Sequence, residues 1–226
     1  MKIDLIKEQL LRITPKLSSD ELFPSIEEEF APCKKYFNGY ILNAGSGSRD
    51  ISNMCNGVII NQDLSNGYHN KNTHIFSPLH MIPFRDGFFD TIICNAVLEH
   101  VENPHEVMKE FNRVCKIDGI LILAIPFMQP EHLDPRDFQR YTIDGIKKIA
   151  IDSGFDVIQV ENIHSVYSTI GWIIFEWLES KNTIEHFFLK FLLYPYIKYK
   201  CHHSHYKVQS IASVYRLIGK KSRDLN

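Results

Sequence analysis

Two glycines and one aspartate are the residues of this chain whose types and spacing best suit the binding of a ligand. Gly45 and Gly47 follow an apolar run at 40–42, and a turn without side chains lets the backbone approach a bound molecule. Asp63 ends a second apolar run, and open α/β sheets bind their ligands at this end of their strands. A carboxylate there is suited to accept hydrogen bonds from the hydroxyls of a ribose.

Two classes of ribose-containing ligand fit this pattern, dinucleotides and S-adenosylmethionine. A dinucleotide site places a third glycine three positions beyond Gly47 and holds pyrophosphate at a helix N-terminus. Asp50 occupies that position, and its carboxylate would repel phosphate. S-adenosylmethionine has no phosphate and carries an ammonium and a sulfonium, so the sequence favours it as cofactor. An NAD-dependent oxidoreductase is the least favoured alternative, and an ordinary strand-to-helix turn also fits the two glycines.

Alternating strands and helices are expected to position these residues. Apolar strand segments at 40–42, 58–63, 73–76, 90–95, 120–125 and 155–160 are interspersed with helical segments at 104–115 and 142–153. Pro104 stands at a first helical position, and Gly154 follows a last helical turn. This alternation predicts a mostly parallel sheet with right-handed crossovers.

The middle of the chain resembles a known family. The segment IPFRDGFFDTIICNAVLEHVENP, followed by EFNRVCKIDGILILAIP, is similar to the second half of class I S-adenosylmethionine-dependent methyltransferases of the broad type 11 family. The resemblance covers residues 38–160 and, more loosely, a closing strand at 209–219. It implies an α/β fold, a Rossmann-like doubly wound sheet of seven strands with an antiparallel last strand.

The resemblance also implies roles for individual residues in binding S-adenosylmethionine. It places the amino-acid end of the cofactor at Gly45 and Gly47, the ribose at Asp63, the methionine side at Asn95 and the adenine near Leu79. Asn95 stands at the end of the fourth strand, and Leu79 lies in the loop that precedes Pro83-Phe84.

Two positions depart from the family pattern. Asn43 stands where an acidic residue usually meets the cofactor ammonium, and an amide can accept a hydrogen bond but lacks the charge. Pro78 stands where an acid usually binds the adenine amino group. A non-catalytic domain that kept the fold as an interaction module is therefore an alternative to an enzyme.

The acceptor is expected beside the loop after the fifth strand. His132 and Asp134 are the candidate catalytic bases there, since an oxygen acceptor must lose its proton at or near transfer. The stretch from His132 to Thr142 is similar to family members found beside glycan-assembly enzymes, which implies a small-molecule or glycan-like acceptor. Arg136, Arg140 and Tyr141 suit binding of such an acceptor or fixing of the loop by salt bridges, and His100 suits packing and hydrogen bonding.

Residues 1–37 are expected to form an N-terminal helical cap on a methyltransferase domain at 38–226, with a helical insertion at 167–206. The apolar face within 170–196 fits packing, an interface between two copies, or peripheral membrane contact in a protein that methylates a quinone or another lipid-like molecule. Neither apolar run reaches the ~20 residues of a membrane span. The cluster from Cys201 to His205 lacks a second pair of metal ligands, so no metal site is predicted.

Composition limits the remaining functions. The 226 residues are 44% hydrophobic, with 25 basic and 27 acidic side chains, so one core is expected and no general nucleic-acid surface. Five cysteines without CxxC spacing suggest reduced thiols and a cytoplasmic location. The charged N-terminus does not resemble a secretory signal.

Overall fold

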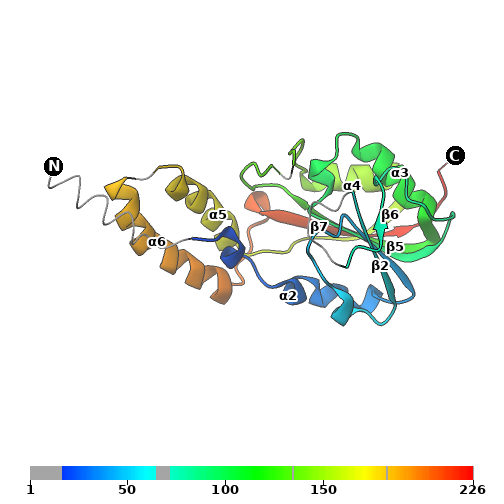
Figure 1. The fold of residues 1–226 in the computed structure, drawn as a ribbon, viewed down its shortest axis with the longest axis horizontal. Coiled ribbons are helices and arrows are strands. Elements are labelled where there is room, and N and C mark those ends of the chain that lie inside the picture. The colour runs from blue at the N-terminus through cyan, green and yellow to red at the C-terminus, as the bar shows by residue number, and fades with distance from the viewer. Residues whose placement is uncertain (1–16, 65–71, 134, 182, 226) are drawn as a thin grey trace. The chain divides into compact units, whose positions relative to one another are not determined.

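A computed structural model describes residues 17–64, 72–133, 135–181 and 183–225 (Figure 1). In chain order the elements are η1 (Ser19–Leu22), α2 (Ile26–Phe30), η2 (Ala31–Tyr36), β1 (Tyr40–Ala44), η3 (Ser52–Met54), β2 (Val58–Asp63), β3 (Ile75–Phe76), β4 (Phe89–Asn95), η4 (Leu98–His100), α3 (Pro104–Val114), β5 (Cys115–Pro126), α4 (Ile143–Asp152), β6 (Phe155–Asn162), α5 (Val166–Glu179), α6 (Ile184–His203), η5 (Gln209–Ile211) and β7 (Val214–Lys221).

The strands form one seven-stranded sheet in the order β3-β2-β1-β4-β5-β7-β6. The pairs β1–β2, β2–β3, β1–β4 and β4–β5 are parallel, and only β7 runs antiparallel to its neighbours β5 and β6. The predicted Rossmann-like sheet with an antiparallel last strand is therefore confirmed. The chain reverses its direction of growth between β1 and β4, and ligands of doubly wound sheets bind at such a switch point.

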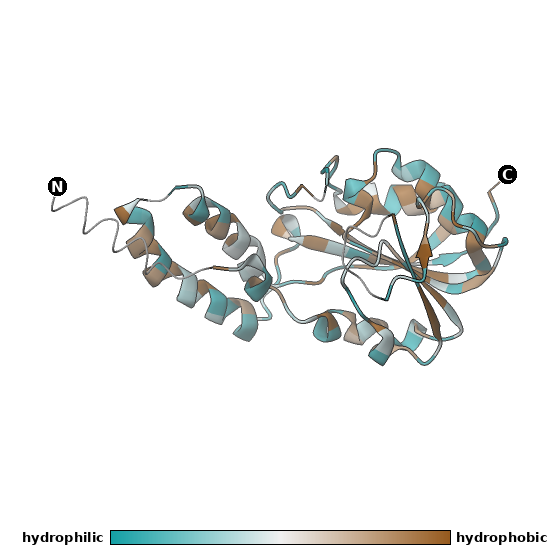
Figure 2. Ribbon diagram, viewed as in Figure 1, coloured by the Kyte–Doolittle hydropathy of each residue, from teal (hydrophilic) through white to brown (hydrophobic). Residues whose placement is uncertain are grey.

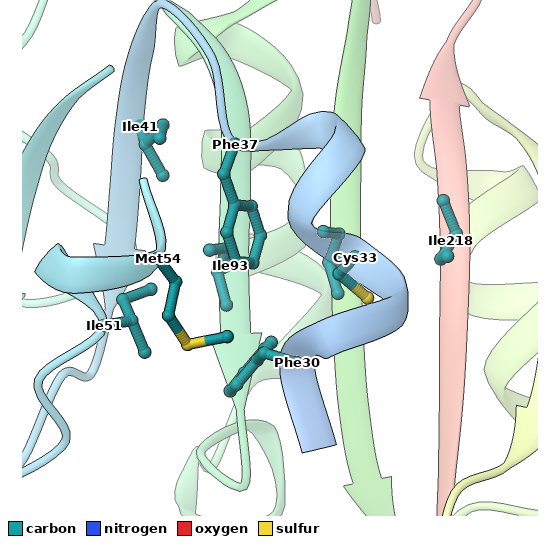
Figure 3. Packing of buried hydrophobic residues seen from close by; sticks show 9 residues of the cluster. Phe30, Cys33, Phe37, Ile41, Ile51, Met54, Ile93 and Ile218 are labelled. Atoms are coloured by element: carbon teal, nitrogen blue, oxygen red, sulfur yellow. The ribbon is translucent and has the colours of Figure 1, made fainter. Parts of the chain in front are cut away.

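Both faces of the sheet are covered, and buried apolar side chains accordingly follow one another in the central strands, as at Ile92-Ile93 in β4 and at 121–125 in β5 (Figure 2). Figure 1 shows α2 on the opposite side of the sheet from α3 and α4. On the α2 side, aromatic and aliphatic side chains from helices and strands form one core cluster: Phe30, Cys33, Phe37, Ile41, Ile51, Met54, Ile93, Ile122 and Ile218 (Figure 3). This core anchors β1 and β4, whose ends carry the predicted cofactor residues.

The helix expected at 25–37 is divided into α2 and η2. A capping box starts α2, in which the Ser25 side chain accepts from the Glu28 amide and the Glu28 carboxylate accepts from the Ser25 amide. Pro32 then stands in the first turn of η2. Because proline lacks an N–H and its ring crowds the preceding turn, the α-helical hydrogen bonds cannot continue through it.

Two expected strands are shorter than the sequence predicted. The segment expected at 73–76 pairs only over Ile75–Phe76, because the His74 ring nitrogen accepts the Asn61 amide at 3.0 Å. The last strand was expected at 209–219 and instead spans Val214–Lys221. Residues Gln209–Ile211 form a 3₁₀ turn, and the Ile211 carbonyl accepts from the Thr169 hydroxyl at 2.9 Å.

The chain forms two compact units. The sheet unit consists of residues 25–127, 131–163 and 214–226, and the helical unit of residues 1–24, 128–130 and 164–213. The described part of the expected cap at 1–37 is thus shared, since η1 belongs to the helical unit whereas α2 and η2 belong to the sheet unit. The helix expected within residues 3–13 lies outside the described residues.

In the helical unit, α5 and α6 lie against each other and against η1. Leu22, Tyr194 and Ile197 form the buried centre of this packing. Gly171 permits the close approach of the two helices, because a Cβ there would meet the Ile197 side chain at 2.8 Å. Tyr194 fastens α6 to η1 by donating its hydroxyl to the Ser18 carbonyl at 2.7 Å. Among the described helices, none has the length and hydropathy needed to cross a bilayer.

Candidate cofactor and acceptor site

The turn at Gly45 and Gly47 follows the carboxyl end of β1 and lies beside the carboxyl end of β2. This turn and the Asp63 side chain together are called the cradle. Both glycines have positive φ angles, 63° and 51°, which strain residues that carry a side chain. A Cβ on Gly45 would lie 2.6 Å from both methyl groups of Val97, whereas a Cβ on Gly47 would meet no atom within 4 Å. The turn is therefore closed on the Gly45 side and open on the Gly47 side, as access for a ligand requires.

Asp63 is joined directly to this turn. Its carboxylate accepts the Gly47 amide at 2.8 Å and the Leu64 amide at 2.7 Å. The neighbouring Gln62 side chain accepts the Gly45 amide at 3.1 Å. The structure thus brings three of the predicted cofactor residues to one edge of the sheet, with the half-buried carboxylate held by backbone donors.

Asn43 has a different place from its neighbours in the motif. It is 5% exposed, and its amide nitrogen donates to the Asn61 side chain at 3.0 Å. Asn61 in turn donates to the Asn72 carbonyl at 3.0 Å. This relay ties β1 to β2 and to the segment before β3, so Asn43 has a clear structural role, and its contact with a cofactor stays a prediction.

Asp50 supplies negative charge beside the turn. Its carboxylate accepts the Ser52 amide at 2.9 Å, and this hydrogen bond lowers the pKa of Asp50 below its ordinary value. The group is therefore ionised at neutral pH. An anion at this place disfavours a ligand pyrophosphate and agrees with the choice of a cationic sulfur nucleoside.

Arg49 is a site residue that the sequence reasoning missed. Its guanidinium donates to the backbone carbonyl of Asn95 at 2.5 Å, across the gap between the glycine turn and the end of β4. Asn95 itself is 9% exposed and is followed by Ala96, which has a positive φ of 53°. A cation next to the predicted amino-acid end of the cofactor suits a carboxylate. The available signal was a basic residue two positions after Gly47.

The end of β3 contributes an apolar wall and one hydroxyl. Leu79 is 6% exposed, in the segment predicted to line the adenine. The Ser77 hydroxyl is buried and has no hydrogen-bond partner among the described residues. The Ser77 amide donates to the Asp63 carbonyl at 3.0 Å, which places Ser77 beside the end of β2. An unpaired hydroxyl here fits a ligand rich in nitrogen and hydroxyl groups, and it lies beside Pro78, where the family acid is missing.

The acceptor loop at 131–142 packs on η4. The Phe138 amide donates to the Glu99 carbonyl at 2.8 Å, and the Gln139 side chain donates to the carbonyls of Leu98 and Val101 at 3.0 and 3.1 Å. His132 lies in this loop with its ring 5.0 Å from that of His100, edge to face. Asp134, the other predicted base, lies outside the described residues.

Arg140 serves to fix this loop. It forms a bidentate pair with Asp137, one of whose contacts is 2.5 Å. Burial acts to raise the pKa of Asp137, but the Arg140 guanidinium and the His132 amide outweigh it and hold the pKa below its usual value. The salt-bridge alternative for Arg140 is thus the one observed. Burial raises the pKa of Tyr141 to about 12, and the charge of Glu99 adds to the effect.

A surface cavity of about 440 Å³ opens beside α3 in the sheet unit. Charged side chains line it, among them Arg113, which is paired with Glu110 and Asp86 at 2.7 Å each. None of the predicted cofactor or catalytic residues lines this cavity. We therefore place the candidate site at the strand ends.

The sheet order and the cradle at the switch point define a class I, Rossmann-like methyltransferase domain. Comparison with known families agrees, because residues 44–123 match the type 11 family model described as a methyltransferase domain. The match covers residues 44–123 of the 226 and identifies this segment as similar to a methyltransferase domain. Methyltransferases of this family use S-adenosylmethionine as methyl donor, and this is the cofactor of the domain.

One relative of the chain extends the comparison without naming an acceptor. An uncharacterised 37.1 kDa protein in a transposon of Streptomyces fradiae is 29% identical over 105 residues, which are 39% of this chain and 30% of that protein. The match thus spans less than a third of the relative's length.

Two solved structures are similar in fold. The first is a Haloferax volcanii complex of the Trm112 methyltransferase activator with a putative methyltransferase, with a TM-score of 0.60 and 13% identity over 87% of this chain and 90% of that one. The second is Haemonchus contortus phosphoethanolamine N-methyltransferase 2 with S-adenosyl-L-methionine, with a TM-score of 0.58 and 14% identity over 88% of this chain and 53% of that one. At such identities the likeness concerns the fold alone.

Proposed function

We propose that this protein transfers the methyl group of S-adenosylmethionine to an oxygen of a small-molecule or glycan-like acceptor. The observation that carries the proposal is the convergence of the Gly47 and Leu64 amides on the Asp63 carboxylate. The two amides fix the orientation of the carboxylate and use one acceptor site on each oxygen. The remaining lone pairs can accept hydrogen bonds from a ligand. Ribose hydroxyls are suited to donate such hydrogen bonds.

Each end of the cofactor has a counterpart in the cradle. The Arg49 guanidinium is suited to the methionine carboxylate, the Asp63 carboxylate to the ribose, and the Ser77 hydroxyl with the Leu79 side chain to the adenine. Asn43, Gly45 and Asn95 shape the pocket between them. When bound, the cofactor supplies a methyl group on a positively charged sulfur, and its transfer to the acceptor oxygen leaves a neutral thioether.

The acceptor side lies at the loop after β5. Transfer is an in-line displacement, so holding the acceptor oxygen in line with the methyl group lowers much of the barrier. We propose that His132 takes the acceptor proton, with the buried Glu99 carboxylate balancing the imidazolium charge. Asp134 stays a predicted base of the same loop.

Calorimetric titration with S-adenosylhomocysteine tests the proposal. We expect a dissociation constant in the micromolar range and loss of binding in Asp63→Ala. Asp156→Ala, an exposed aspartate on β6, is the matched control and should bind as the unmodified chain does. If the unmodified chain does not bind, the alternative of a non-catalytic interaction module is favoured, and binding of NAD instead would favour an oxidoreductase.

A lipid-like acceptor is a second candidate, and the surface of α6 favours it. Phe188, Leu192, Tyr196 and Tyr199 recur at helical spacing and are 56–71% exposed. The Lys200 ammonium lies 5.8 Å from the Tyr196 ring centre, which adds positive charge to the aromatic stripe. Aromatic and basic side chains together suit the interface of an anionic phospholipid membrane.

Liposome flotation tests this candidate. We expect the chain to float with vesicles that contain phosphatidylserine, and Leu192→Ser to reduce the bound fraction. Ile158→Ser changes an exposed apolar residue on β6 and serves as control. Failure to bind either neutral or anionic vesicles would remove membrane contact from consideration.

A further inference from the structure

A buried carboxylate and two imidazoles meet at the acceptor side of the sheet unit. Glu99 and His100 belong to η4, which follows β4, and His132 lies in the loop that follows β5. Because β4 and β5 are parallel neighbours, with Asn95 beside Ala124, both segments leave the sheet at the same edge. Each of the three residues offers one ligand atom, and these atoms lie within 4.8 Å of one another.

The Glu99 carboxylate is the unusual member of this cluster. The side chain has no exposed surface, and neither oxygen has a hydrogen-bond partner among the described residues. Burial of a carboxylate is costly unless a cation or hydrogen bonds compensate it. The Nε2 atoms of His100 and His132 each lie 3.7 Å from the same oxygen, Oε1, which is too long for a hydrogen bond.

The two imidazoles present these nitrogen atoms in an orientation that suits a metal. The His100 Nδ1 atom is 2.5 Å from the Arg136 carbonyl, so Nδ1–H donates and the Nε2 lone pair faces Glu99. Metal-binding histidines usually have such a partner behind the ring. His132 has Asp137 Oδ2 at 3.7 Å and Arg140 Nη2 at 3.4 Å on its Nδ1 side, and both belong to the pair that fixes the loop.

The spacing also agrees with a metal site. Ligand atoms bound at about 2.1 Å to one tetrahedral ion lie about 3.4 Å apart. Binding would therefore draw the two rings inward from the 3.7 Å nitrogen–oxygen distances and from the 4.8 Å within which all three ligand atoms lie. The set of two imidazoles and one carboxylate is typical of divalent transition metals such as Zn²⁺, Co²⁺ and Fe²⁺ rather than of Mg²⁺ or Ca²⁺.

We propose that Glu99, His100 and His132 bind one divalent transition-metal ion. Three protein ligands leave a coordination position open. The identification of its occupant as the acceptor oxygen rests on the proposed function, whereas binding of the ion does not. With the ion bound, the Nε2 lone pair of His132 is a ligand and cannot take the acceptor proton. The ion would then lower the pKa of the bound acceptor oxygen, in place of proton removal by His132.

Metal titration of the full chain after treatment with a chelator tests this proposal. We expect one Zn²⁺ per chain by elemental analysis, and a visible absorption band when Co²⁺ is added instead. His100→Ala and His132→Ala should each weaken Zn²⁺ binding by at least about 100-fold, since they remove ligands rather than supporting groups. His105→Ala removes an exposed histidine at the start of α3 and should leave binding unchanged.

Other results would overturn the proposal. Absence of Zn²⁺ and Co²⁺ binding to the unmodified chain is one, and unchanged binding in the two ligand variants is another. Loss of binding in His203→Ala would assign the metal to the end of α6, where His203 Nδ1 lies 2.8 Å from the Tyr199 carbonyl.

Titration of the same samples with S-adenosylhomocysteine shows whether the variants are folded. It also separates this proposal from the preceding one, because metal binding without nucleoside binding would contradict only the proposed function. If His132→Ala does not fold, Glu99→Gln provides the same test, since it keeps the shape of the side chain and removes the charge.

Discussion

Two regions at the same edge of the sheet differ in how their polar side chains are hydrogen-bonded. One is formed by the ends of β1 and β2, and the other by the segments that follow β4 and β5. At β1 and β2 the Asp63 carboxylate receives two backbone amides, and the Asn43 amide is paired with Asn61. After β4 and β5 the Glu99 carboxylate is buried with no hydrogen-bond partner among the described residues. In the first region the polar groups are paired within the protein, whereas the second contains a carboxylate that a cationic ligand would compensate.

This difference suits the first region to positioning of a ligand and the second to binding of a cation or a proton. A preorganised cradle loses little entropy when it binds, whereas an uncompensated charge favours a cation or a proton. Substitutions that disturb one region and keep the other intact therefore test this difference.

The largest expected effect is that of Gly45→Ala. The alanine would have to keep the positive φ of Gly45, and its methyl group would lie 2.6 Å from the Val97 side chain. We therefore expect the free energy of unfolding to fall by about 3 kcal/mol. Gly47→Ala has the same conformational cost but no steric conflict, and about 1 kcal/mol is expected. Urea unfolding of both variants measures the difference. Equal losses would show that Val97 does not limit the turn.

Asp137→Asn should be next in size and should depend on pH. The folded-state pKa of Asp137 is lowered, so its stabilisation is present above the ordinary aspartate value near 4 and is lost as the pH falls through the folded-state value. At pH 7 we expect a loss of about 2 kcal/mol, because Arg140 loses its bidentate carboxylate partner. Thermal unfolding at pH 7 and at pH 3 should show a smaller difference at the lower pH.

Arg49→Lys should weaken binding of S-adenosylhomocysteine by about 10-fold, since a lysine keeps the charge but cannot form the forked contact to a carboxylate. The change of stability should be small, because the lost contact is to the Asn95 carbonyl at the edge of the cradle. Calorimetry measures the affinity. Unaltered affinity would exclude Arg49 from the cofactor site.

Glu99→Gln should have the smallest effect and the opposite sign. In chelator-treated protein, removal of a buried charge without hydrogen bonds should raise the unfolding free energy by about 1 kcal/mol. A carboxylate that serves only to pair with protonated histidines would instead give a loss. The melting temperature at pH 7 distinguishes the two outcomes.

The sequence was sufficient for the sheet and the cradle because both depend on local patterns. Gly45, Gly47 and Asp63 follow or end apolar runs, and alternating strands and helices predicted the parallel sheet, whereas the number of strands and the antiparallel last strand were implied by the family resemblance. The cluster at Glu99 was missed because its members are 33 positions apart and meet only when the loop at 131–142 packs on η4. Two histidines and an acid after neighbouring strands were the available signal. The edge strand at Ile75–Phe76 was overestimated because a side chain, His74, replaces a backbone acceptor.

The chain leaves the sheet after β6 and returns to it at β7, and these two places are neighbours in the sheet. The helical insertion lies between them in the sequence. Asn162 at the end of β6 is the register partner of Tyr215 near the start of β7, and the Ile163 amide donates to the Val214 carbonyl. The two ends of the insertion are therefore about 5 Å apart, the spacing of paired residues in an antiparallel ladder. A short hairpin turn has the same end-to-end distance, so gene rearrangement can exchange this segment for another length of chain without altering the register of β6 and β7. Changes of length in this insertion are thus compatible with an unchanged sheet and with unchanged strand ends at Gly45 and Asp63.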